Sequence, residues 1–223
     1  MHQQPRRVRG VIFDMDGVLC ESEPFTCRAA TQMLDELYGL KVRPEEFHPF
    51  VGTGEDRFIG GVAESHGLAI DIVAAKARTY EIYLDLIKGR LKPLFGAPEF
   101  VAWCRELGMR LAVATSADSI KMDGNLSQID LPRERFDAIV VGQDVAAKKP
   151  APDVFLLAAR RLDLPPEDCL VVEDALSGVR AAKAAGCRCL ALTTSFSEGE
   201  LLAAGADWVS PHLGGVPEGV FLL

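Results

Sequence analysis

Apolar and polar positions along the chain follow two alternating periods. Short apolar runs predict buried strands, and stretches with apolar positions at helical spacing predict amphipathic helices. After a first apolar run at 11–13, the pattern predicts strands at 110–115, 138–141, 169–173, 188–192 and 207–209, and helices at 96–107, 117–128, 152–162, 175–185 and 197–204. Strands that alternate with helices indicate a parallel sheet covered on both faces.

The stretch 22–89 has no strand pattern. Its apolar residues recur at helical spacing over 23–39 and again over 69–88. We therefore predict an α/β fold: a Rossmann-like, doubly wound parallel sheet with an inserted α-helical cap domain. The cap would comprise 22–89, and the core would comprise 1–21 and 90–223.

Composition and charge narrow the range of functions. The 223 residues are 48% hydrophobic and 25% charged, as in globular proteins with a sizeable core. A formal net charge of −8 argues against binding of nucleic acid. Because no apolar run approaches the ~20 residues that span a bilayer, and no signal-like region is present, we expect no membrane partner and a cytoplasmic location. We also expect a monomer.

Cysteines and histidines carry no recognisable metal motif. No cysteine pair has CxxC spacing, and Cys187 and Cys189 alternate along a predicted strand, which favours buried free thiols over metal ligands. The four histidines are scattered along the chain. We therefore expect neither a zinc site nor a catalytic triad.

The strongest chemical signal follows the first apolar run. Asp14 and Asp16 are one residue apart, so on a strand end their side chains would point the same way, and Gly17 permits a sharp turn. Two neighbouring carboxylates stay ionised at neutral pH when a cation joins them. The pattern predicts a divalent metal and a carboxylate that can act as nucleophile or base. A solvated acidic turn is the alternative.

Three further strand ends carry complementary groups. In chain order they bear a hydroxyl, an ammonium and a pair of carboxylates, from Ser116, Lys149 and Glu173-Asp174. Ligands of open α/β sheets bind beyond the carboxyl ends of the strands, so these groups would converge on one crevice. Their charges suit a phosphate and a magnesium ion. Ser116 and the acidic pair could instead cap the helices that follow them.

This order and spacing closely resemble the haloacid dehalogenase-like hydrolase superfamily over about 11–209. The matching motifs are Asp14-Met15-Asp16-Gly17 for DxDG, Ser116 for the serine motif, Lys149 for the lysine motif and Glu173-Asp174 for the acidic motif. The stretches 149–155 and 172–179 look like the β-phosphoglucomutase and phosphoglycolate phosphatase branch. The stretches 50–55 and 116–121 resemble the hydrolase domain of plant suppressor-of-quenching proteins.

The resemblance implies a Mg²⁺-dependent phosphatase that hydrolyses a small phosphorylated metabolite, such as a phosphosugar, through an aspartyl-phosphate intermediate. A metal ion and a lysine would offset the repulsion between the attacking carboxylate and the phosphoryl group. The implied nucleophile is Asp14, and Asp16 is the implied general acid and then base. The implied phosphate contacts are Gly17, Ser116, Ala117 and Lys149, and the implied metal site is Asp14, Asp16, Glu173 and Asp174.

Substrate specificity would belong to the cap segment 52–57, with predicted contacts from Gly52, Thr53, Glu55 and Arg57. β-Phosphoglucomutase carries an arginine for a second phosphate where this chain has Glu55, which would repel that phosphate. Hydrolysis is therefore favoured over a phosphosugar mutase reaction, unless Arg57 substitutes after a two-residue shift. A catalytically silent interaction module is the remaining alternative, and a receiver domain would need only about half this length and no cap.

Overall fold

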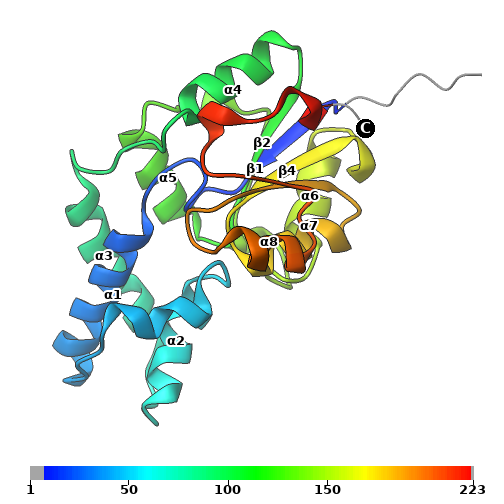
Figure 1. Ribbon diagram of the computed structural model, residues 1–223. Helices are drawn as coiled ribbons and strands as arrows, with labels where there is room; N and C mark the ends of the chain where they lie inside the picture. Colours follow the sequence, from blue (N-terminus) through cyan, green and yellow to red (C-terminus); the bar gives the residue numbers. More distant parts are fainter. Residues whose placement is uncertain (1–7, 222–223) are drawn as a thin grey trace, which may run out of the picture.

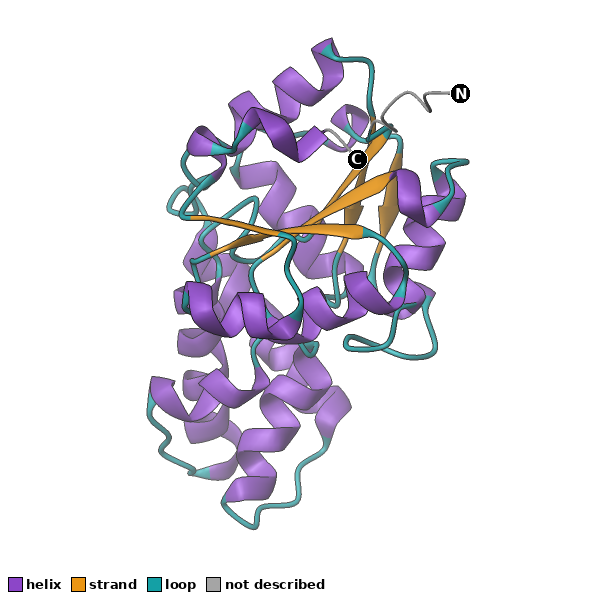
Figure 2. Ribbon diagram, turned by 45° about the vertical axis from the view of Figure 1, so that its right-hand side comes forward, coloured by secondary structure: helices purple, strands orange, loops and turns teal. Residues whose placement is uncertain are grey.

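The computed structural model describes residues 8–221 (Figures 1 and 2). Its centre is a six-stranded, all-parallel sheet in the order β3-β2-β1-β4-β5-β6. The strands are β1 (Gly10–Phe13), β2 (Arg110–Ala114), β3 (Ala138–Val140), β4 (Cys169–Glu173), β5 (Arg188–Leu192) and β6 (Trp208–Ser210). The predicted α/β fold with a doubly wound parallel sheet is confirmed.

Helices cover both faces of this sheet (Figure 1). They are α4 (Ala97–Glu106), α5 (Ser119–Gln128), α6 (Asp153–Arg161), α7 (Leu176–Ala184) and α8 (Glu198–Ala204). Because side chains alternate along β1, Phe13 packs with α4 and α5 on one face, whereas Ile12 packs with α6, α7 and α8 on the other.

The strand order places a crevice at the carboxyl ends of β1 and β4. From β1 the chain winds outward through β2 and β3, and it then returns to β4 on the other side of β1. Phe13 is in register with Val172, and the Asp14 amide donates to the Val172 carbonyl at 2.9 Å. The residues that follow both strands therefore meet at the switch point where such sheets bind ligands.

The insertion between β1 and α4 is entirely helical. It contains α1 (Glu23–Tyr38), α2 (Glu55–Ser65) and α3 (Ile72–Ile87), and it lies beyond the carboxyl ends of the strands (Figure 1). Helix α3 begins later than the predicted 69, because the Asp71 side chain caps it by accepting from the amides of Val73 and Ala74. The exact division between cap and core remains a prediction.

Short 3₁₀ helices complete the structure. They are η1 (Pro44–Phe50), η2 (Arg133–Arg135), η3 (Gly142–Asp144), η4 (Pro166–Asp168), η5 (Leu213–Gly215) and η6 (Glu218–Phe221). The last two lie near the carboxyl end of the described range. Within 8–221, no helix is long and apolar enough to cross a membrane.

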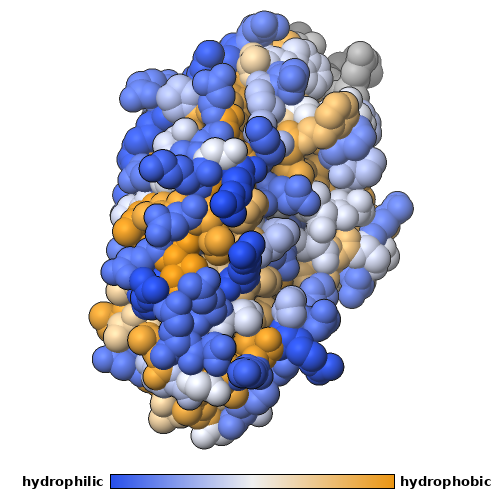
Figure 3. Space-filling view, turned by 90° about the vertical axis from the view of Figure 1, so that its left-hand side faces the viewer, coloured by the Kyte–Doolittle hydropathy of each residue, from blue (hydrophilic) through white to orange (hydrophobic). Residues whose placement is uncertain are grey.

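The surface mixes polar and apolar residues. On the face shown in Figure 3, hydrophilic residues predominate and apolar residues form patches between them. Large exposed apolar side chains are Leu37, Val73, Phe95, Leu107, Ile120, Leu156 and Leu202, each from a different helix or loop. Scattered exposure of this kind is ordinary for a globular protein.

The cap lies directly against the core. Lys76 of α3 forms ion pairs with Asp118, which precedes α5, and with Asp56 of α2, both at 2.8 Å. In the loop before α2, Gly54 has a φ of 89°, and a Cβ there would lie 3.2 Å from the Ser116 carbonyl oxygen. The cap backbone therefore approaches the core closely only because this position is glycine.

Candidate active site

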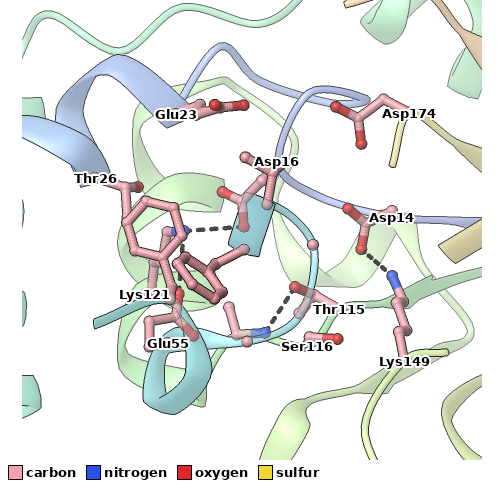
Figure 4. Close-up of a pocket in the computed structure, with 16 residues that line it drawn as sticks. Asp14, Asp16, Glu23, Thr26, Glu55, Thr115, Ser116, Lys121, Lys149 and Asp174 are labelled. Carbon is pink, nitrogen blue, oxygen red and sulfur yellow. Dashed lines mark hydrogen bonds and ion pairs between the residues drawn. The ribbon is translucent and has the colours of Figure 1, made fainter. Parts of the chain in front are cut away.

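The ends of β1, β2 and β4 and the loop after β3 surround a cavity of about 60 Å³ beneath the cap (Figure 4). Acidic residues, hydroxyls, two lysines and the cap loop line it. The lining residues are Asp14, Asp16, Glu23, Thr26, Phe50, Val51, Gly52, Gly54, Glu55, Phe58, Thr115, Ser116, Ala117, Lys121, Lys149 and Asp174. Of the predicted site residues, Gly17, Thr53, Arg57 and Glu173 do not line the cavity.

Lys149 is a buried cation at the centre of the site. Its Nζ donates to Asp14 Oδ1 and to Glu173 Oε1, both at 2.6 Å, and to the Ala114 carbonyl at 3.3 Å. Burial lowers the pKa of Lys149, but the two carboxylates more than offset this effect and hold that pKa above its usual range. The ammonium therefore stays charged and fixes one oxygen of Asp14, leaving Oδ2 free of hydrogen bonds from residues 8–221.

Both oxygens of Glu173 are already used within the protein. Oε1 accepts from Lys149, and Oε2 accepts from the amides of Asp174 and Ala175 at 2.9 and 3.0 Å. A Cβ on Gly178 would overlap the Glu173 carboxylate, so α7 packs tightly against it. Glu173 thus holds the lysine and the loop before α7 in place, but it does not cap α7, whose N-cap residue Ala175 has no side-chain cap hydrogen bond.

Asp174 completes an acidic cluster. Carboxylate oxygens of Asp14, Glu173 and Asp174 lie within 4.8 Å of one another. Asp174 accepts hydrogen bonds from Ser195 and, at 3.3 Å, from Thr194. Burial raises the pKa of Asp14 to about 7, although Lys149 opposes it, and burial also raises the pKa of Asp174 well above its ordinary value.

The residues present fit a divalent cation. One ammonium does not balance three buried carboxylates, and oxygen ligands are those that Mg²⁺ prefers. Because both Glu173 oxygens are engaged, Asp14 and Asp174 are the side chains with oxygens available for a metal. The main-chain carbonyl of Asp16 is the further ligand that the family resemblance implies.

Asp16 lines the same cavity but has different partners from Asp14. Its carboxylate accepts from Ser22, from Lys121 Nζ at 3.0 Å and from Asn125 Nδ2 at 3.3 Å. The last two donors come from α5, and Figure 4 shows Asp16 turned toward Lys121. The two aspartates therefore share the cavity while each is held by its own lysine.

The hydroxyl of Ser116 is buried and has no hydrogen-bond partner within 8–221. It does not cap α5, which begins only at Ser119 after Asp118 at the N-cap position. The capping alternative for Ser116 is therefore wrong, and its hydroxyl remains available to a ligand in the cavity. The neighbouring Ala117 amide, a predicted phosphate contact, donates instead to the Thr115 hydroxyl at 3.0 Å.

In the cap segment, Glu55 alone brings a charged side chain to the cavity. Its Oε1 forms an ion pair with Lys121 at 3.1 Å, and its Oε2 is buried without a partner in the described chain. Arg57 turns away: it contacts Glu64 at 2.6 Å, lies over the Phe50 ring, and its side chain is 55% exposed. Thr53 donates to the Phe50 carbonyl at 2.7 Å.

Sequence reasoning did not identify Lys121, Asn125 and Tyr83 as residues of the site. Lys121 and Asn125 donate to Asp16, and Tyr83 donates to Asn125. Lys121 is buried between Asp16 and Glu55, which together outweigh the effect of burial and raise its pKa well above the usual value. Lys121 and Asn125 are four residues apart, so they share a face of α5. That spacing was visible in the sequence, but no motif distinguished this face from a solvated one.

A family model for haloacid dehalogenase-like hydrolases matches residues 8–186. The chain belongs to this hydrolase family, which confirms the family predicted from the four strand-end motifs. The residues of the four motifs follow the strand ends beyond which open α/β sheets bind ligands.

Several relatives are similar over nearly the whole chain. Protein SUPPRESSOR OF QUENCHING 1, chloroplastic, from Arabidopsis thaliana is 45% identical over 94% of this chain, which spans only 20% of that protein. The phosphorylated carbohydrates phosphatase of Thermotoga maritima is 36% identical, with 89% and 92% of the two chains covered. Among solved structures, CbbY from Rhodobacter sphaeroides in complex with xylulose 1,5-bisphosphate has a TM-score of 0.88 at 30% identity, covering 97% of this chain and 100% of that one.

The acidic cluster predicts how stability of the metal-free protein depends on pH. Because the pKa values of Asp14 and Asp174 are raised, the native state binds protons that the unfolded state has released, so stability falls as pH rises from about 4 through about 7. We expect Asp174→Asn to raise the melting temperature in chelator at pH 8 and to flatten this dependence. Thermal unfolding between pH 5 and 8 checks it, and a variant less stable than wild type at pH 8 would contradict it.

Proposed function

We propose that the chain is a Mg²⁺-dependent phosphatase that hydrolyses a small phosphomonoester, such as a phosphosugar, through an aspartyl-phosphate on Asp14. The observation that carries this proposal is the buried Lys149 that fixes one oxygen of Asp14 beside an acidic cluster suited to a cation. The names of the relatives support the substrate class, since they include a phosphorylated carbohydrates phosphatase and a fructose-1-phosphate phosphatase.

In the first step, the free oxygen of Asp14 attacks phosphorus, and the ester P–O bond breaks. Asp16 donates a proton to the leaving oxygen, which departs as an alcohol. The unpartnered Ser116 hydroxyl donates to a phosphoryl oxygen, and Lys149 stabilises the negative charge. A bound Mg²⁺ would supply further charge neutralisation between Asp14 and the phosphoryl group.

In the second step, water attacks the phosphorus of the aspartyl-phosphate. Asp16, now ionised, accepts the proton of that water, and the bond between Asp14 and phosphorus breaks to release inorganic phosphate. Lys149 then returns to its ion pair with the free Asp14 carboxylate. The same acid–base group therefore serves both steps in opposite directions.

The chain spans a fifth of the chloroplastic Arabidopsis protein. A cytoplasmic location and a monomeric state stay predictions. The silent-module alternative is disfavoured because the cavity contains all the groups that the reaction requires.

Asp14→Asn should abolish turnover, by at least about a thousandfold, because it removes the nucleophile. Hydrolysis of p-nitrophenyl phosphate in Mg²⁺ measures this loss, and circular dichroism checks that the fold is intact. Asp85→Asn, at an exposed position of α3, is the matched control and should keep wild-type activity. Near-normal activity of Asp14→Asn would refute the nucleophile assignment.

Magnesium should support activity and calcium should inhibit it. Calcium accepts more oxygen ligands at longer distances, so it can bind both oxygens of Asp14 and pull the nucleophile out of line. The measurement is phosphatase activity after exhaustive chelation, followed by addition of each metal alone and of both together. Full activity without metal, or calcium replacing magnesium without loss, would exclude the proposed site.

Hydrolysis should dominate over a phosphosugar mutase reaction. A mutase must hold a second phosphate, but Arg57 points away and Lys121 is already shared by Asp16 and Glu55. The ion pair with Lys121 reduces the repulsion between Glu55 and a second phosphate. It does not provide a free cation to bind that phosphate. With β-glucose 1-phosphate and a trace of the 1,6-bisphosphate, we expect free phosphate to form; rapid glucose 6-phosphate formation with little free phosphate would reverse the assignment.

A further inference from the structure

The acid–base group Asp16 is connected to the cap by a buried hydrogen-bonded path. Asn125 of α5 donates from Nδ2 to Asp16 Oδ1 at 3.3 Å. Tyr83 of α3 donates from its hydroxyl to Asn125 Oδ1 at 2.5 Å. Tyr83 and Asn125 are both fully buried, and they belong to the cap and the core respectively. The path therefore crosses the boundary between the two.

The two hydrogen bonds of this path run in the same direction, from Tyr83 to Asn125 and from Asn125 to Asp16. The Asn125 amide donates from its NH₂ group to Asp16 Oδ1 and accepts at its oxygen from the Tyr83 hydroxyl. Burial raises the pKa of Tyr83, which keeps the proton on its hydroxyl. Without that hydroxyl, the Asn125 oxygen would be buried and unsatisfied, and the amide could turn or shift.

The Tyr83 ring has a separate contact that a conservative substitution preserves. Lys121 Nζ, the other α5 donor to Asp16, lies 5.4 Å from the centre of this ring. Replacement of Tyr83 by phenylalanine keeps the ring beside Lys121 and removes only the hydroxyl. The substitution therefore isolates the path through Asn125.

We propose that Tyr83 is a positioning residue for Asp16, acting through Asn125, so that the acid is aligned when the cap lies against the core. The inference rests on the proposed phosphatase function, in which Asp16 protonates the leaving oxygen. A poor leaving group needs that proton, whereas p-nitrophenolate leaves without it. Misalignment of Asp16 should therefore slow poor leaving groups selectively, but a general structural defect should slow all substrates alike.

The test is the ratio of kcat/KM for phenyl phosphate to kcat/KM for p-nitrophenyl phosphate, at saturating Mg²⁺. The two substrates have similar shape and differ in their need for an acid. We expect Tyr83→Phe to lower this ratio about tenfold, within the range that a general acid contributes, and Asn125→Ala to lower it in the same direction. Asp16→Asn sets the largest change that loss of the acid can cause.

Tyr80→Phe is the matched control. Tyr80 is buried on the same helix, and within 8–221 no hydrogen bond joins its hydroxyl to Asp16 or Asn125. Removal of the Tyr80 hydroxyl should leave the ratio of kcat/KM values at the wild-type value. In the Asp16→Asn background, Tyr83→Phe should cause no further fall, because residues that act through one group are not additive.

Three results would overturn the proposal: an unchanged ratio in Tyr83→Phe, an equal fall in Tyr80→Phe, or an additive fall in the double variant. Thermal unfolding of each variant shows whether it is folded at the assay temperature. If Tyr83→Phe is not folded, Asn125→Ala tests the same path. Failure of the proposed function has a different signature, because the wild type would then hydrolyse neither aryl phosphate in Mg²⁺.

Discussion

The buried ammonium of Lys149, shared by Asp14 and Glu173, is the interaction on which the site depends. It joins the loop after β3 to the ends of β1 and β4, and it offsets part of the repulsion between carboxylates that burial would otherwise force to be neutral. Glu173 reaches onward to the amides before α7, so one network fixes Asp14, Lys149 and the acidic loop. The excess negative charge that remains is what suits the site to a metal.

Strand order makes this network possible. β1 and β4 are neighbours although more than a hundred residues separate them, because the chain winds outward on one side of β1 and returns on the other. Glycine at position 17 is part of the same arrangement: its φ is 73°, and a Cβ there would overlap the Asp174 carboxylate. Topology thus brings the charged groups together, and local backbone conformation lets them approach closely.

The sequence was sufficient to predict the sheet, the helical insertion and the strand-end residues, because each depends on local periodicity or on a short motif. It was not sufficient for contacts between cap and core. The interpretation of Arg57 as a phosphate grip depended on which way one side chain of α2 turns, and Glu64 and Phe50 determine that. Lys121 looked like an ordinary helix lysine until tertiary packing placed it between Asp16 and Glu55.

The cap and the core are joined by apolar packing and by ion pairs near the cavity. A cavity of about 60 Å³ has room for only a few water molecules, so a larger ligand would need more space between cap and core. The ion pairs near the cavity join Lys76 with Asp118 and Glu55 with Lys121 across the boundary between cap and core. In this arrangement the cap residues Glu55 and Tyr83 supply partners to Lys121 and Asn125, the two α5 residues that hold the Asp16 carboxylate.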